Sequence, residues 1–195
     1  MSHYFINDDN VNHNIQKHTI TFNNKEYNFL TDNGVFAKRG LDYGTNILLE
    51  ALIKEDIKGS VLDLGCGYGP VGIILASIFN ITPDLVDINE TAITLSLENM
   101  SLNNVKGNAF ISDGYSCVSN KYNYIITNPP IRAGKKKVYE LIFEAKNYLM
   151  SNGELWLVIR KQQGAKSLLN DLSTQYLTKV ITKSKGYFVI KCQNR

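Results

Sequence analysis

The chain has 195 residues, enough for one domain with a full hydrophobic core and too few for two large ones. Hydrophobic residues make up 44% and charged residues 20%, as in ordinary globular proteins, and no apolar run is long enough to span a membrane. The net charge of +3 permits a nucleic-acid partner without requiring one. Three scattered cysteines without metal-ligand spacing argue against a disulfide framework or a metal site, and the start has no signal-like segment, so we expect a cytoplasmic protein.

Residues 1–33 are predicted to form an arm and a β-hairpin that pack on the main domain. Residues 1–17 are rich in Asn, Asp and His and show weak periodicity, which is typical of a loose or locally docked arm. Residues 19–22 and 27–30 alternate apolar and polar side chains on either side of a turn-like Asn-Asn-Lys-Glu. We therefore assign residues 34–195 to the main domain.

A polar segment, Asp-Tyr-Gly-Thr at 42–45, precedes a helix expected over 46–53. Thr45 fits two roles: it is either the N-cap of this helix or, with Asp42, a contact for the polar end of a ligand. The second role follows from position, because the segment comes just before the glycine-rich stretch.

One stretch of the chain combines an apolar run, alternate glycines and a proline. It is residues 61–72, Val-Leu-Asp-Leu-Gly-Cys-Gly-Tyr-Gly-Pro-Val-Gly. The apolar run at 61–64, with one acid at Asp63, predicts a central strand of a parallel sheet. The three alternate glycines let the backbone turn tightly and let a ligand approach it, and Pro70 suits the first turn of a helix. Strand, glycine loop and helix in this order are typical of a nucleotide or nucleoside site.

The spacing of the glycines favours one ligand class over another. It is G-x-G-x-G, whereas the dinucleotide fingerprint is G-x-G-x-x-G. The carboxylate of Asp63 would repel a diphosphate, but it suits a ligand that carries an amine and a sulfonium charge. A glycine-rich turn without a ligand is the plain structural alternative.

Two further acids follow predicted strands. Asp87 ends a strand expected over 82–89, about 20 residues beyond the glycine loop, where a carboxylate binds a ribose diol. Asp113 follows a strand at 109–111 and suits the exocyclic amine of an adenine, although an Asx-turn explains it equally well when it is taken alone.

Asn128-Pro129-Pro130-Ile131 follows a strand predicted over 122–127 and is the most informative tetrapeptide of the chain. A planar amine such as that of a nucleobase is a poor nucleophile, and two hydrogen-bond acceptors on its N–H groups would aim its lone pair at an electrophile. The side-chain carbonyl of Asn128 and the main-chain carbonyl of Pro129 are such acceptors, and consecutive prolines hold both in place. Ile131 would give an extruded base an apolar contact without a π-face.

A run of cations comes directly after this tetrapeptide. Cations at a helix N-terminus oppose the helix dipole, so phosphate contacts from a polynucleotide explain the run better than a solvated helix start does. The predicted RNA-binding residues, at this run and after a later strand, are Arg132, Lys135, Lys136, Lys137, Arg160 and Lys161.

The rest of the chain completes an α/β pattern. Helices are expected over 90–100, 137–149 and 165–172, a turn at 151–153, a strand over 154–159, and an antiparallel pair at 180–182 and 187–190. We predict a Rossmann-like three-layer α/β/α sandwich, whose mostly parallel seven-stranded sheet ends in an antiparallel edge hairpin.

With Asp63 to Gly69, Asp87, Asp113 and Asn128-Pro-Pro in that order, the chain resembles the class I S-adenosylmethionine (SAM)-dependent methyltransferases. Within them it is similar to the small-domain family typified by the ribosomal RNA guanine-N2 methyltransferase C. Gly34-Val35-Phe36, Asp42 to Thr45 and Asn128 to Lys135 also look like that family's segments.

The resemblance implies transfer to N2 of a guanine in small-subunit (16S) rRNA, with ribosomal RNA or a ribosomal subunit as partner. The glycine loop would hold the methionine moiety, and Asn128, Pro129, Pro130 and Ile131 would hold the target amine. The predicted cofactor-binding residues are Thr45, Asp63, Gly65, Cys66, Gly67, Gly69, Asp87, Ile88, Asp113, Gly114 and Asn128.

Two departures leave the RNA target open: better-known members carry an additional N-terminal domain, and Ile131 replaces an aromatic residue. Adenine N6 in tRNA or DNA and a protein glutamine present the same planar N–H2 group. More remote alternatives are a nicotinamide-dependent oxidoreductase, disfavoured by the glycine spacing, and a non-catalytic RNA-binding module, disfavoured by the intact motifs.

Overall fold

The computed structural model describes residues 14–33, 41–130 and 133–194. Most of the predicted arm, the segment that contains Gly34 to Phe36, and the pair Ile131 and Arg132 therefore lie outside the described residues. No helix in the described part of the chain is long and apolar enough to cross a membrane.

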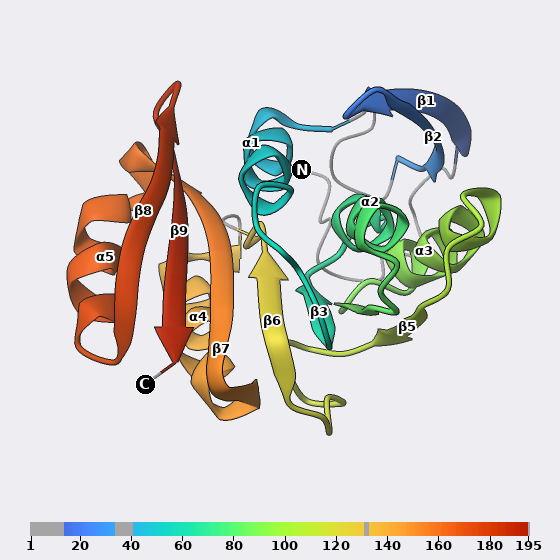
Figure 1. Cartoon of the computed structure of the whole chain (residues 1–195). Coiled ribbons are helices and arrows are strands. Elements are labelled where there is room, and N and C mark those ends of the chain that lie inside the picture. The colour runs from blue at the N-terminus through green and yellow to red at the C-terminus, as the bar shows by residue number, and fades with distance from the viewer. Residues whose placement is uncertain (1–13, 34–40, 131–132, 195) are drawn as a thin grey trace.

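A seven-stranded sheet with the order β5-β4-β3-β6-β7-β9-β8 forms the centre of the molecule (Figure 1). Its strands are β3 (Val61–Leu64), β4 (Asp84–Asp87), β5 (Asn108–Ile111), β6 (Tyr122–Thr127), β7 (Leu149–Arg160), β8 (Tyr176–Ser184) and β9 (Tyr187–Asn194). The strands from β5 to β7 pair in parallel, whereas β9 is antiparallel to β7 and to β8. The predicted mostly parallel sheet with an antiparallel edge hairpin is confirmed.

Helices cover both faces of this sheet. On one side lie α1 (Tyr43–Leu52), α2 (Pro70–Phe79) and α3 (Glu90–Leu102), and on the other lie α4 (Lys135–Tyr148) and α5 (Ala165–Ser173). The buried apolar side chains form two clusters that match these two interfaces, one with α1 to α3 and one with α4 and α5. A short 3₁₀ helix, η2 (Lys161–Gln163), connects β7 to α5. This is the expected three-layer sandwich.

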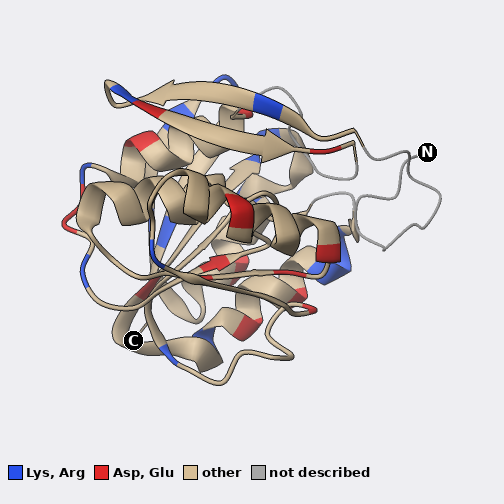
Figure 2. Ribbon diagram, turned by 90° about the vertical axis from the view of Figure 1, so that its right-hand side faces the viewer, with Lys and Arg blue, Asp and Glu red and all other residues tan. Residues whose placement is uncertain are grey.

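The N-terminal hairpin, β1 (Gln16–Phe22) and β2 (Lys25–Thr31), is a separate two-stranded sheet. Its side chains Ile20, Phe22, Tyr27 and Phe29 alternate along the strands and are buried in the same core cluster as α1 to α3. Figure 2, in which the ribbon is coloured by residue type, shows acidic and basic residues interspersed along the chain. The hairpin is thus attached to the main sheet through the helices.

One of the two roles left open for Thr45 is excluded, and one predicted turn is wrong. The N-cap of α1 is Asp42, whose side chain accepts hydrogen bonds from the backbone N–H groups of Gly44 and Thr45, so Thr45 lies inside the helix. The turn expected at 151–153 lies within β7, because β7 pairs with β6 at both Leu149 and Glu154. Residues 150–153 therefore bulge opposite the single residue 123, and Asn152 takes a positive φ of 60° there.

Candidate active site

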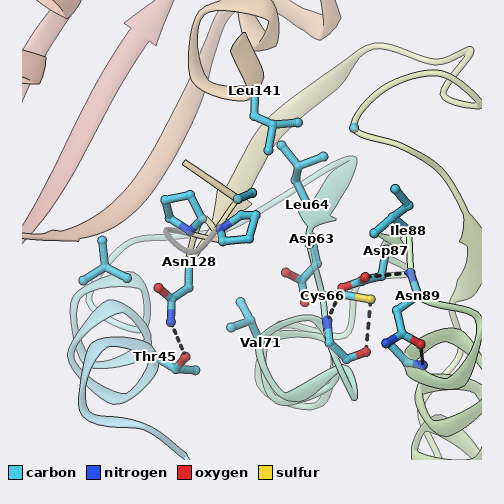
Figure 3. Close-up of a pocket in the computed structure, with 18 of the residues that line it drawn as sticks. Thr45, Asp63, Leu64, Cys66, Val71, Asp87, Ile88, Asn89, Asn128 and Leu141 are labelled. Atoms are coloured by element: carbon cyan, nitrogen blue, oxygen red, sulfur yellow. Dashed lines mark hydrogen bonds between the residues drawn. The ribbon is translucent and has the colours of Figure 1, made fainter. Parts of the chain in front are cut away.

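A cavity of about 480 Å³ opens at the carboxyl ends of β3, β4, β6 and β7 (Figure 3). This is the edge at which ligands of doubly-wound sheets bind, and the volume is within the ordinary range of ligand pockets. Most of the predicted site residues line it, namely Thr45, Asp63, Gly65, Cys66, Gly67, Asp87, Ile88, Asp113, Gly114, Asn128, Pro129, Pro130, Lys137 and Arg160.

The glycine loop connects β3 to α2 with its backbone exposed to this cavity. Gly65, Gly67 and Gly69 have φ of 71°, 58° and 88°, values that favour glycine. An added Cβ would meet nothing within 4 Å at Gly65 or Gly67, but at Gly69 it would lie 2.9 Å from the Ser96 Oγ. The first two glycines therefore leave room for a ligand against the main chain, while Gly69 packs tightly behind the loop.

Asp63 is almost completely buried beside the loop, with 2% of its surface exposed. Its Oδ2 accepts a hydrogen bond of 2.8 Å from the backbone N–H of Gly72. Burial, reinforced by the negative charge of Asp87, raises the pKa of the Asp63 carboxyl to about 7, against the weaker opposing effect of the Gly72 hydrogen bond. A cationic group in the cavity would favour the ionised form of this carboxyl.

Asp87, the last residue of β4, is hydrogen-bonded to the backbone of the glycine loop. Its Oδ2 accepts from the Gly67 N–H at 2.9 Å, and its Oδ1 accepts from the Asn89 N–H at 3.0 Å. Burial raises the pKa of this carboxyl, and these backbone hydrogen bonds counteract the effect. Asn89 in turn caps α3, and Ile88 is partly exposed at the cavity wall.

Asp113 and Gly114 line the cavity just after the end of β5. The Oδ1 of Asp113 forms an ion pair of 2.7 Å with the Nζ of Lys137 at the start of α4. Lys137, predicted as an RNA contact, thus lies beside the residue predicted to bind adenine. Gly114 has a φ of 62°, and an added Cβ would lie 2.7 Å from Leu141.

Asn128 lies at the end of β6, and its carboxamide has a defined orientation (Figure 3). Its Nδ2 donates to the Thr45 Oγ1 at 3.0 Å and to the Asp42 Oδ2 at 3.3 Å. The Thr45 hydroxyl donates its own hydrogen to Asp42 over 2.5 Å, so it can only accept from Asn128. The Asn128 nitrogen therefore donates to the N-terminus of α1, and the Asn128 Oδ1 remains available as an acceptor on the opposite side of the carboxamide.

The cations predicted to bind RNA occupy different surroundings. Arg160 lines the cavity with its guanidinium 4.7 Å from the Tyr187 ring centroid, and Lys161 is exposed next to it. Lys135 lies over the Tyr139 ring at 5.1 Å, and Lys136 is 4.0 Å from Glu140. Ile131 and Arg132 are outside the described residues, so the last member of the predicted tetrapeptide has no structural account.

The sequence analysis did not identify a row of three polar residues along α3 and its C-cap that are hydrogen-bonded to neighbouring backbone groups. They are Ser96, Asn99 and Asn103. The Ser96 hydroxyl donates to the Gly67 carbonyl at 2.9 Å, and the Asn99 amide donates to the Tyr68 carbonyl at 2.9 Å. Asn99 also exchanges two hydrogen bonds with the peptide groups of Leu30, and Asn103 does the same with Asn28. Polar residues at i, i+3 and i+7 of an otherwise amphipathic helix were the available signal.

The sequence of this chain is similar to those of known proteins. Residues 26–191 match the family model described as Methyltransferase small domain. The chain is 39% identical to the uncharacterized protein YbxB of Bacillus subtilis, over 98% of both chains. It is 37% identical to ribosomal RNA small subunit methyltransferase C of Aliivibrio fischeri, over 73% of this chain and 43% of that protein.

A solved structure of the T. Thermophilus 16S rRNA N2 G1207 methyltransferase (RsmC), in complex with AdoMet and guanosine, has the same fold with a TM-score of 0.84 at 23% identity. The alignment covers 93% of this chain and 51% of that one, so the chain spans about half the length of the methyltransferase C proteins it matches. The class I methyltransferase fold and the predicted resemblance are confirmed. This chain belongs to the methyltransferase small-domain family.

Proposed function

We propose that this protein is a SAM-dependent RNA methyltransferase that modifies the exocyclic amine of a nucleobase, with guanine N2 of small-subunit rRNA as the target. The observation that carries the proposal is the fixed carboxamide of Asn128, whose nitrogen is held by Thr45 and Asp42. The relatives named as rRNA methyltransferases support the guanine and the rRNA. The predicted cytoplasmic location belongs to the same proposal.

SAM is the cofactor of this domain, as the sequence predicted, and the cavity fits it. Gly65 and Gly67 have no Cβ, and the space that one would take up is empty, so the cofactor has room against the main chain. We assign the methionine moiety to this loop and to Asp63, the ribose to Asp87 beside Ile88, and the adenine to Asp113 and Gly114. When bound, the cofactor supplies a methyl group on a positively charged sulfur, and the buried Asp63 carboxyl complements that charge.

The residues of the chain act on the acceptor amine. The Oδ1 of Asn128 accepts a hydrogen bond from one N–H, and the carbonyl of Pro129 accepts from the other. Both acceptors are positioned before the substrate arrives: Thr45 and Asp42 hold the carboxamide, and the two prolines restrict the backbone. Neutral acceptors avoid an ion pair with the sulfonium group. After transfer, the amine loses a proton to water, so no general base is required.

Exposed cations, of which Arg160 lines the cavity, support a polynucleotide substrate. Arg160, Lys161, Lys135 and Lys136 all lie on the exposed surface near β7, η2 and the start of α4. Their charges match phosphates on either side of a target nucleotide.

A methyl-transfer assay with labelled SAM tests the proposal. Substrates would be small ribosomal subunits, free 16S rRNA, tRNA, DNA and a glutamine peptide, followed by mass spectrometry of the digested nucleosides. We expect N2-methylguanosine from ribosomal RNA. Methylated adenosine or glutamine as the dominant product would contradict the assignment of the substrate.

Variants of Asn128 test the proposed acceptor. Asn128→Ala should abolish turnover and largely keep SAM affinity, whereas the exposed Asn170→Ala on α5 serves as the matched control with wild-type turnover. Normal turnover by Asn128→Ala would refute the acceptor role.

A further inference from the structure

The cavity extends beyond Asn128 to an aromatic side chain outside every predicted motif. Tyr187, the first residue of β9, lines the cavity together with Arg160, Gln163 and Val158. It arrives there because β9 pairs antiparallel with β7 and sets Tyr187 opposite Arg160, the last residue of β7. The C-terminal hairpin therefore contributes a wall to the same edge of the sheet as Asn128.

Several contacts hold the Tyr187 ring in place. An added Cβ at Gly44 would lie 3.0 Å from the Tyr187 Cε1, so the ring packs directly against the backbone of α1. The Tyr43 ring lies 5.5 Å from it at 56°, and the Tyr43 hydroxyl is hydrogen-bonded to the Ser184 hydroxyl at 2.6 Å. These contacts order the aromatic surface before a substrate arrives.

Exposed cations surround this aromatic pair. The Arg160 guanidinium lies 4.7 Å from the Tyr187 ring centroid, and the Lys185 Nζ lies 4.8 Å from that of Tyr43. Lys161 and Lys183 are exposed in the adjacent segments, and the Lys161 N–H donates to the Gly186 carbonyl at 2.7 Å. A rigid aromatic face bordered by exposed cations is the arrangement with which proteins bind unpaired nucleotides.

The tetrapeptide at 128–131 contains no aromatic residue that could stack on a base. The residue after Asn128-Pro-Pro is Ile131, which has no π-face, so a base held at Asn128 needs its stacking partner from another part of the chain. We propose that Tyr187 is that partner and that Arg160 and Lys185 bind the phosphates of the extruded nucleotide and its neighbour. This inference rests on the proposed function and assigns its acceptor subsite.

Arg160 has two roles in this assignment. Without RNA its exposed guanidinium lies over the ring, and such an exposed cation–π contact is weak. A stacking base can therefore replace it on the ring, and the released guanidinium is then free to pair with a phosphate.

The test compares Tyr187→Leu with Tyr187→Phe in the methyl-transfer assay on the RNA that the wild type modifies. The Leu variant should raise the KM for RNA by roughly 5- to 150-fold, the range for losing one stacked base. The Phe variant should stay within about twofold of wild type, because it retains the ring. SAM affinity should be unchanged in both, which also reports that they are folded.

Tyr148→Leu is the matched control, since Tyr148 is a half-buried tyrosine that stacks on Tyr115 at 4.4 Å and does not line the cavity. It should leave the KM for RNA unchanged. An unchanged KM in Tyr187→Leu, or a Phe variant as impaired as the Leu variant, would overturn the stacking role while the proposed function stands. A wild-type protein that methylates no RNA would overturn the proposed function and this inference with it.

A Tyr187→Trp variant gives a direct readout of stacking. The chain has one native tryptophan, Trp156, which is completely buried, so a change in emission on adding RNA reports on position 187. We expect quenching by RNA in the Tyr187→Trp protein and none in a Tyr148→Trp control. RNA binding without quenching at position 187 would overturn the proposal.

Discussion

The carboxamide nitrogen of Asn128 lies 3.0 Å from the hydroxyl oxygen of Thr45, and this contact joins the end of β6 to the first turn of α1. Because Thr45 donates its own hydrogen to Asp42, the contact has one direction, and the carboxamide cannot flip without losing it. The orientation of the proposed amine acceptor is thus set by a residue that does not touch the amine.

Removing this hydrogen bond should impair catalysis more than binding. Thr45→Val keeps the shape of the side chain and removes the hydroxyl, so the carboxamide is held only by its longer contact with Asp42, and we expect kcat to fall about 2- to 10-fold for one hydrogen bond. Thr45→Ser should restore most of the rate. Single-turnover methyl transfer measures the effect, and equal losses in the Val and Ser variants would show that packing, not the hydroxyl, matters.

Asp87 should contribute to cofactor affinity through both of its carboxylate oxygens. Asp87→Ala removes the acceptor of the Gly67 N–H and the proposed ribose ligand, so we expect SAM binding to weaken by about 1–3 kcal/mol in isothermal titration. Asp84→Ala, at the opposite end of β4, is the control and should leave affinity unchanged. Unaltered affinity in Asp87→Ala would remove this residue from the ribose site.

The acids of the site could be predicted because the topology decides where they lie. In a parallel sheet the carboxyl ends of all strands lie at the same edge. An acid at the end of β4 and an amide after β6 therefore lie at the same edge, independently of the conformation of the loops. The glycine spacing was equally informative, since Gly65 and Gly67 adopt backbone angles that other residues rarely take.

Contacts between side chains distant in sequence could not be predicted in the same way. The orientation of Asn128 depends on Asp42, 86 residues earlier, and the position of Tyr187 depends on antiparallel pairing with Arg160. Asn99 was assigned no role in the helix predicted over 90–100, yet it is completely buried beneath the hairpin. Packing of one element on another, which periodicity does not encode, fixes all three.

The buried Asp63 should make the stability of the ligand-free protein depend on pH. Its pKa is about 7 when folded and 3.8 as the ordinary value, so the folded state holds a proton that the unfolded state has lost between these values. The free energy of unfolding therefore decreases as pH rises through this window, by up to ~1.4 kcal/mol per pH unit from this group.

Asp63→Asn isolates the effect because an amide oxygen can still accept from the Gly72 N–H and does not titrate. In denaturant unfolding at pH 5 and pH 8, the variant should be more stable relative to wild type at pH 8 than at pH 5. A constant difference between the two proteins would mean that Asp63 does not titrate in this range.

Asn99 should connect the N-terminal hairpin to the cofactor site. Its side chain makes hydrogen bonds of 2.6 and 3.0 Å with Leu30 of β2 and one of 2.9 Å with the Tyr68 carbonyl in the glycine loop. Asn99→Ala leaves these buried backbone groups without their partner, so we expect a loss of about 2–4 kcal/mol in the free energy of unfolding. SAM affinity should fall as well, because the loop loses one of its supports.

Asn103→Ala is the matched comparison, since Asn103 makes the same pair of hydrogen bonds to Asn28 of β2 but none to the loop. It should cost less stability, because Asn103 is partly exposed, and it should leave SAM affinity unchanged. Calorimetric titration of both variants at a temperature where each is fully folded separates the two effects. Equal SAM affinities in the Asn99 and Asn103 variants would mean that the hairpin is anchored by α3 without influencing the glycine loop.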